Sequence, residues 1–252
     1  MRAVANADAT AANGCAAYRG DDPCLPCALA KAQETTGHAP VRRRLRRGEA
    51  LFREGEACRS VYAVRSGTLK TVMPGLDARE QVTGFQLAGD LLGLDGLGHG
   101  RHASRAIALE DAEVVVLPYG GDARGDPREL GTVLPRLIGR ELVRKQKLAV
   151  LLSCMSAEQR LASFLLNLSR RLEARGYSAT DFHLRMTRSE IGSYLGLNLE
   201  TVSRTMSMLH ERGLVEVDGR HVILRNRRAL ARCFDEPSRR PRTAAPAVRL
   251  RA

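Results

Sequence analysis

Residues 186–224, MTRSEIGSYLGLNLETVSRTMSMLHERGLVEVDGRHVIL, decide the fold of this chain. Thr187 and Glu190 form the Ser/Thr-x-x-Glu pattern of a capping box, which predicts a helix that begins directly after Thr187. Gly196 then permits a tight turn, and Asn198 supplies the N-cap of a second helix. Two short helices joined by a glycine-bearing turn predict a helix-turn-helix.

The second of these helices has an apolar and a polar face. Val202, Met206 and Leu209 recur at helical spacing and predict the inner face. The outer face near the start of the helix then lies where a recognition helix reaches base edges in the major groove. The predicted DNA-binding residues are Glu200, Thr201, Ser203 and Arg204, with Arg188 at the start of the first helix.

A β-hairpin is predicted directly after the second helix. Apolar, β-rich residues lead from Leu214 to Val217 and return from Val222 to Leu224, with Asp218-Gly219 between them as a type I′ turn signal. A helix-turn-helix followed by a β-hairpin is a winged helix, so this stretch predicts DNA binding. A merely structural helix pair is the alternative, but the ordered set of capping box, glycine turn, outward arginine and hairpin disfavours it.

The composition favours a polyanionic partner. The chain has 252 residues, enough for two modest domains, and a net charge of +12 in which arginine dominates. No apolar run approaches the roughly eighteen residues of a membrane span, and the N-terminus lacks the apolar core of a signal peptide. We therefore expect a cytoplasmic protein with no membrane partner, whose six cysteines are thiols, metal ligands or redox switches. No Ser/His/Asp or paired-carboxylate set indicates an enzyme.

The periodicity divides the chain into five parts. Residues 1–40 lack lasting periodicity and predict a flexible segment. Residues 41–126 carry short β-rich runs punctuated by glycine and predict a β-roll or sandwich. Residues 127–156 predict a long dimerisation helix, and residues 157–234 the winged-helix domain. Residues 235–252 predict a disordered basic tail.

The long helix carries an apolar seam at three- and four-residue intervals, as in a coiled coil. Dimerisation through this seam is favoured because a two-fold protein matches palindromic DNA. Packing against the β domain is the alternative. The predicted seam residues are Leu142, Lys145, Leu148 and Leu152.

Five segments resemble the CRP/FNR family of transcription regulators, and most closely its FNR branch. The resemblance spans residues 41–230 and implies an α+β fold with three parts. These are a sensory domain at residues 41–126, which is a β-roll of the jelly-roll, cyclic-nucleotide-binding kind, a long dimer helix and a C-terminal winged helix-turn-helix. It also implies a homodimer that binds a TTGAT-N4-ATCAA-like palindrome, contacts RNA polymerase and serves oxygen- or redox-linked gene control. The segments are LFREGE (51–56), VYAVRSGTLK (61–70), TGFQLAGDLLGLDGLG (83–98), AEQRLASFLLNLSRR (157–171) and MTRSEIGSYLGLNLETVSR (186–204).

The E-x-x-S-R motif of FNR proteins falls on Glu200, Ser203 and Arg204. Arg204 can bond guanine O6 and N7, and Glu200 can accept from cytosine N4, whereas Ser203 discriminates less.

Lys145 stands where FNR proteins carry an Asp that opposes dimerisation. A lysine facing its own copy would still repel, but less, because its ammonium group can bend into water.

The chain departs from the pattern of the oxygen-sensing FNR proteins, which hold a [4Fe-4S] cluster. The N-terminal cysteines are spaced C-x8-C-x2-C rather than close to C-x2-C-x5-C, and the fourth-ligand position aligns with Val115, which cannot bind iron. A C-x-x-C pair can grip a metal, but incidental cysteines on a flexible arm are the alternative. Three hypotheses stay open: a rearranged cluster, a thiol switch through Cys24 and Cys27 or through Cys154, and a FixK-like regulator without cluster sensing. The ligands of a rearranged cluster would be Cys15, Cys24, Cys27 and Cys58.

Cyclic AMP is not expected as a ligand. The resemblance aligns the phosphate-binding Arg-Ser pair and nearby Glu of the cyclic AMP branch with His102, Ala103 and Leu94, and without the arginine nothing there neutralises a cyclic phosphate.

Two alternatives to an FNR-type regulator are kept. One is a redox-centre protein, an electron carrier or thiol enzyme, that uses the N-terminal cysteines. The other is a regulator that senses a small ligand inside the β-roll.

Overall fold

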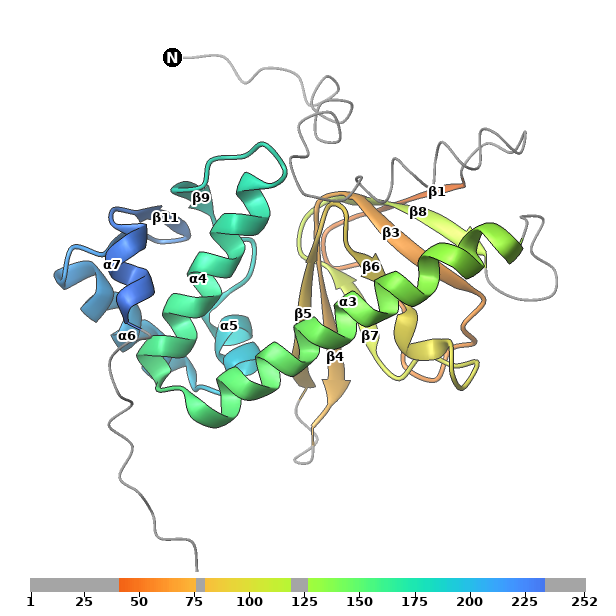
Figure 1. The fold of residues 1–252 in the computed structure, drawn as a ribbon, viewed down its shortest axis with the longest axis horizontal. Helices are drawn as coiled ribbons and strands as arrows, with labels where there is room; N and C mark the ends of the chain where they lie inside the picture. The colour runs from red at the N-terminus through yellow and green to blue at the C-terminus, as the bar shows by residue number, and fades with distance from the viewer. Residues whose placement is uncertain (1–40, 76–79, 119–126, 234–252) are drawn as a thin grey trace, which may run out of the picture.

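The computed structural model describes residues 41–75, 80–118 and 127–233 as a β-roll, a long helix and a C-terminal helical unit with a small sheet (Figure 1). The predicted flexible segment 1–40, with Cys15, Cys24 and Cys27, and the predicted tail 235–252 lie outside these residues. No helix within the described ranges is long and apolar enough to cross a membrane.

The β-roll consists of two four-stranded antiparallel sheets. Their strand orders are β1-β8-β3-β6 and β2-β7-β4-β5. A short 3₁₀ helix, η1 (Leu94–Gly96), follows β6. The strands are β1 (Arg42–Leu45), β2 (Ala50–Phe52), β3 (Ser60–Ser66), β4 (Thr68–Pro74), β5 (Glu80–Leu87), β6 (Leu91–Leu92), β7 (Arg105–Ala108) and β8 (Ala112–Pro118).

Successive side chains of a strand point to opposite faces of its sheet, and those that point inward build the core between the two sheets. Val64 and Val114 of one sheet meet Leu69 of the other in a buried cluster. Their neighbours Ala63 and Val115 belong to a separate apolar cluster on the opposite face of the first sheet. The pattern thus confirms the predicted β-roll, with both faces of the β3–β8 pair covered.

The β-rich runs that the sequence shows at residues 51–52, 61–64, 69–72, 82–85 and 114–117 correspond to β2, β3, β4, β5 and β8. The sequence does not predict β1, β6 and β7. Strand β1 reads Arg42-Arg43-Arg44-Leu45, in which Leu45 alone is buried. It is a strand because it pairs antiparallel with β8, an interaction that its own residues do not signal.

Two helices connect the β-roll to the C-terminal unit. Helix α3 (Pro127–Cys154) runs across the β-roll toward that unit (Figure 1). Helix α4 (Ala157–Glu173) follows after a single turn, because Ser156 and Gln159 form a reciprocal capping box at its start.

The C-terminal unit contains the helix-turn-helix and a three-stranded sheet of order β10-β11-β9. Its elements are β9 (Asp181–His183), α5 (Arg188–Leu195), α6 (Leu199–Glu211), β10 (Val215–Asp218), β11 (His221–Leu224) and α7 (Arg227–Arg232). Val82 and Phe85 of β5 share one buried cluster with Leu165, Ile191 and other residues of this unit. The unit therefore packs on the β4–β5 side of the roll (Figure 1).

The wing hairpin is present but shifted by one residue from its predicted turn. Asp218 pairs with His221, so the two loop residues are Gly219 and Arg220 rather than Asp218 and Gly219. Gly219 adopts a φ of 57°, which favours glycine. The pairing of Val222 with Phe182 in β9 fixes this register from a distant part of the chain.

Candidate nucleic-acid interface

The first helix of the helix-turn-helix starts and ends as its sequence predicts. The Thr187 hydroxyl accepts from the Glu190 N–H at 3.2 Å, and the Glu190 carboxylate accepts from the Thr187 N–H at 2.6 Å. Gly196 ends the helix in the left-handed conformation with φ 62°. Inside the helix, a Cβ on Gly192 would lie 2.6 Å from the Leu197 carbonyl oxygen, so glycine permits this close turn.

The second helix, α6, is oriented by its buried face. The Asn198 side chain accepts from the Thr201 N–H at 2.7 Å and caps the helix start. Val202 and Met206 are fully buried, which leaves Glu200 and Arg204, four residues apart, exposed on the opposite face.

The remaining predicted contact residues lie at the edges of this exposed face. Thr201 and Ser203 flank it and are half-buried, and Arg188 is half-buried at the first position of α5. Ser207, which was not predicted, is exposed one turn after Ser203 and extends the same face, as its i+4 spacing indicates.

The charges of this face suit double-stranded DNA, a polyanion whose base edges are exposed in the major groove. Glu200 lies in the first turn of α6, where the helix dipole favours a carboxylate. Arg204 forms no ion pair with any other described residue, so its guanidinium group is available for guanine. Arg220 is exposed at the tip of the wing hairpin and adds a second cation to the C-terminal unit.

Comparison with known proteins decides the family. Residues 42–121 match the cyclic nucleotide-binding domain, and residues 159–233 match the Crp-like helix-turn-helix domain. The chain is 42% identical over 189 residues to the fumarate and nitrate reduction regulatory protein of Escherichia coli K12, covering 74% of this chain and 76% of the relative. The chain belongs to the CRP/FNR family. It is an FNR-like DNA-binding transcription regulator, and its family is one of regulators rather than enzymes.

Two further relatives agree with this assignment. The anaerobic regulatory protein of Pasteurella multocida is 39% identical over 225 residues, covering 86% of this chain and 82% of the relative. The structure of FixK2 from Bradyrhizobium japonicum superimposes with a TM-score of 0.69 at 33% identity, covering 77% of this chain and 97% of that one. The predicted α+β architecture of this CRP/FNR regulator is therefore confirmed.

Asp90, directly before β6, fastens the long helices of the regulator to the β-roll. Its carboxylate pairs with Arg171, with Arg175 at 3.2 Å and with Arg144 at 3.8 Å, and it accepts from the Leu87 N–H at 2.8 Å. Burial by itself raises the pKa of the Asp90 carboxyl, but the three arginines outweigh burial and hold the pKa below its ordinary value of 3.8. The carboxylate is thus charged and shared by α3 and α4.

The predicted seam residues of α3 do not share one environment. Leu142 is 57% exposed, whereas Leu148 and Leu152 are half-buried toward their own chain. The ammonium group of Lys145 donates to the Thr83 carbonyl oxygen at 2.7 Å and lies 3.6 Å from the Glu141 carboxylate. The contact of Lys145 with its own copy stays a prediction, but in the protomer this lysine ties α3 to the edge of β5.

The positions tied to an iron–sulfur cluster do not form a ligand set within the described residues. Val115 is buried among apolar side chains. The Cys58 thiol faces the carbonyl oxygens of Gly93, at 3.6 Å, and Ser60, at 3.8 Å. Burial and the nearby Asp95 charge raise the pKa of this thiol, which disfavours the thiolate that binds iron. No group of three or more His, Cys, Asp or Glu side chains suited to a metal occurs in the described ranges.

The segment that aligns with the phosphate-binding residues of the cyclic AMP branch is hydrogen-bonded to the carboxylate of its own Asp95. Asp95 accepts from the Ala103 N–H at 3.0 Å and from the Ser104 hydroxyl at 2.7 Å. His102 is buried, stacks on Phe52 with ring centroids 3.8 Å apart, and lies 3.5 Å from Asp95. The Ala103 N–H and the Ser104 hydroxyl are therefore already satisfied within the chain.

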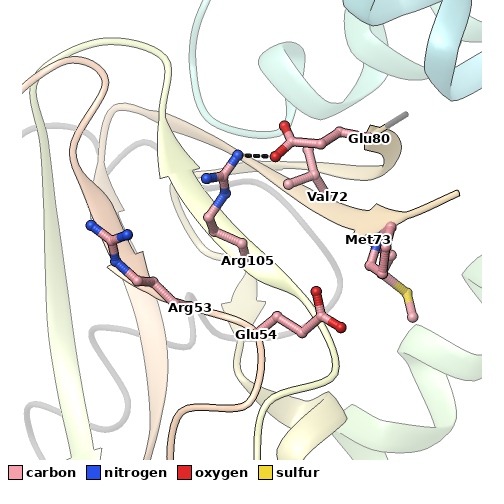
Figure 2. Close-up of a pocket in the computed structure, with 7 residues that line it drawn as sticks. Arg53, Glu54, Val72, Met73, Glu80 and Arg105 are labelled. Atoms are coloured by element: carbon pink, nitrogen blue, oxygen red, sulfur yellow. Dashed lines mark hydrogen bonds and ion pairs between the residues drawn. The ribbon is translucent and has the colours of Figure 1, made fainter. Parts of the chain in front are cut away.

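A pocket of about 340 Å³ lies on the β-roll near the β4–β5 hairpin. Figure 2 shows its charged side chains, with Arg105 paired to Glu80 and with Arg53 and Glu54 beside them. Apart from Val72 and Arg105 its lining residues are exposed, so the pocket is an open surface with both charges rather than an enclosed chamber. The lining residues are Arg53, Glu54, Val72, Met73, Pro74, Glu80 and Arg105.

Proposed function

We propose that this regulator is a cytoplasmic homodimer that binds a TTGAT-N4-ATCAA-like inverted repeat and contacts RNA polymerase. The observation that carries the proposal is the exposed face of α6, on which Glu200 and Arg204 lie four residues apart. These are the two residue types that read cytosine N4 and guanine O6/N7 in the major groove. Thr201, Ser203 and Arg188 flank them and supply weaker base or phosphate contacts.

The outer surface of α3 supports a homodimer. Apolar side chains are exposed there in the protomer, and a second copy of the helix would cover them. Leu142 of the predicted seam is among them, and the seam as a whole is part of the proposal. The exposed apolar residues are Ile138, Leu142, Val143 and Val150.

Binding to the inverted repeat tests the proposal. Fluorescence anisotropy would compare a labelled duplex carrying the repeat with a duplex of the same composition in scrambled order. We expect the repeat to bind at least about a thousandfold more tightly, as is typical of specific regulators, with no cyclic nucleotide added. Equal affinity for both duplexes, or binding as a monomer, would contradict the proposal.

The signal is proposed to be oxygen- or redox-linked, because the relatives include an anaerobic regulatory protein. The described residues do not fit a [4Fe-4S] cluster completed on the β-roll. The side chain of Val115 has no atom that can bind iron, and the Cys58 thiol is directed toward backbone carbonyl groups. Cys154, at the end of α3, is exposed, whereas Cys58 is half-buried and Cys233 is buried.

We therefore expect Cys58→Ser to leave the metal content unchanged. The protein would be purified without oxygen, and iron and acid-labile sulfide would be measured in wild type and variant. Iron and sulfide at cluster stoichiometry in the wild type, lost in Cys58→Ser, would show that Cys58 is a ligand after all. Cys154→Ser is the matched control, since it removes a thiol that lies outside the β-roll.

A further inference from the structure

Lys70 connects the β-roll to the start of the helix-turn-helix. Its ammonium group lies 2.7 Å from the Glu190 carboxylate, and the two side chains are 17% and 18% exposed. The same carboxylate accepts from the Thr187 N–H at 2.6 Å and closes the capping box of α5. A strand of the sensory domain is thus joined to the first turn of the helix that precedes α6.

A second contact holds α5 farther along its length. The Ser193 hydroxyl accepts from the Val82 N–H of β5 at 2.8 Å, and the Gln81 side chain donates to the Ser193 carbonyl oxygen. Beside this contact, the ring of Tyr194 lies 5.2 Å from that of Phe85, measured between centroids. We call the Lys70–Glu190 pair and the Ser193–Val82 hydrogen bond the α5 clamp.

The α5 clamp fixes α6 relative to the β-roll. Helix α5 is attached at two points to two neighbouring strands, so it cannot turn on the roll without breaking a half-buried polar contact. Helix α6 follows after the tight turn at Gly196 and moves with α5. In a two-fold dimer, the separation of the two α6 helices then depends on this attachment, and that separation sets which half-site spacing can be read.

We propose that Lys70 is a specificity-determining residue for the spacing between the half-sites, acting through Glu190 and the position of α5. This inference rests on the proposed function, because it requires a dimer on an inverted repeat. Loss of the ammonium group leaves the base-reading residues and the capping box of α5 in place. Each half-site is then still read, while the distance between the two reading helices becomes less restricted.

The test measures spacing preference rather than affinity alone. Full-length wild type and Lys70→Met would be titrated against the proposed repeat and against duplexes with the spacer one base pair shorter or longer. We expect the wild type to prefer one spacing, measured as the ratio of its affinities for the best duplex and the other two. In Lys70→Met this ratio should shrink by a factor of about three to ten, in line with typical coupling energies. Glu190→Gln should behave in the same way, because glutamine preserves the capping box but loses the charge.

Arg65→Met is the matched control, because it removes an ion pair with Glu113, 2.5 Å long, that lies within the β-roll. It should leave the spacing preference unchanged. The inference is overturned if Lys70→Met and Glu190→Gln keep the wild-type preference or lose affinity equally for all three duplexes. A wild-type protein that binds none of the duplexes would instead contradict the proposed function itself.

Discussion

Replacing Asp90 by alanine is expected to lower the free energy of unfolding by about 3–5 kcal/mol, the cost of removing one partner of a buried ion pair. The carboxylate is shared by Arg144, Arg171 and Arg175. Among the described residues, the substitution leaves Arg171 and Arg175 without an acidic partner and leaves Arg144 with Glu141 alone, at 3.4 Å. Urea unfolding followed by circular dichroism at neutral pH measures the loss.

Asp111→Ala is the control for this experiment. Asp111 is exposed and, among the described residues, its side chain accepts one hydrogen bond, from the Arg47 N–H at 3.0 Å, so its loss should cost no more than about 1 kcal/mol. A loss of the same small size in Asp90→Ala would show that the three arginines find other partners and that Asp90 does not hold α3 and α4 to the roll.

The Asp90 contribution also predicts a pH dependence. The arginines hold the pKa of Asp90 in the folded protein below its ordinary value of 3.8, despite burial. The stabilisation is therefore complete above pH 3.8 and is lost as the pH falls through the lower, folded-state pKa. The difference in stability between wild type and Asp90→Asn should shrink in that acidic range and stay constant above it.

Arg204→Ala is expected to weaken binding to the inverted repeat by about 1–3 kcal/mol for each half-site. It should also remove the discrimination between guanine and other bases at one position of each half-site, since the bidentate contact to O6 and N7 is lost. Competition between duplexes that differ at that position measures both effects.

Arg220→Ala provides the contrast to Arg204→Ala. Arg220 lies at the wing tip, where we expect a phosphate contact, so its loss should weaken binding to all sequences equally and reduce the salt dependence. If Arg204→Ala behaved in the same way, Arg204 would contact only the phosphate backbone, and base reading would belong to other residues of α6.

The helix-turn-helix was predictable because its signals are local. The side chains of Thr187 and Glu190 each accept from the backbone N–H of the other within one turn. At α6 the Asn198 side chain alone caps the helix start, by accepting from the Thr201 N–H. The left-handed Gly196 between them needs no distant contact to adopt its conformation. Such elements are encoded by neighbouring residues, and the structure reproduces them at the predicted positions.

What the sequence did not reveal depends on partners far along the chain. The wing register is fixed by pairing with β9, so a local turn signal placed it one residue early. The heptad-like spacing of α3 predicts a seam but not its neighbour, and Lys145 bonds Thr83, 62 residues away. Lys70 and Glu190 are separated by 120 residues, and neither carries a motif that predicts the other.

Arg160 in α4 has a consequence for how motion travels through the molecule. Its guanidinium group donates to the Leu152 carbonyl oxygen near the end of α3, at 2.6 Å, and to the Leu195 carbonyl oxygen at the end of α5, at 2.9 Å. One rigid, planar group thus joins the carboxyl ends of two helices. If α3 slid or twisted against a second subunit, the Arg160 side chain would carry that displacement to the bend before α6 without involving the β-roll.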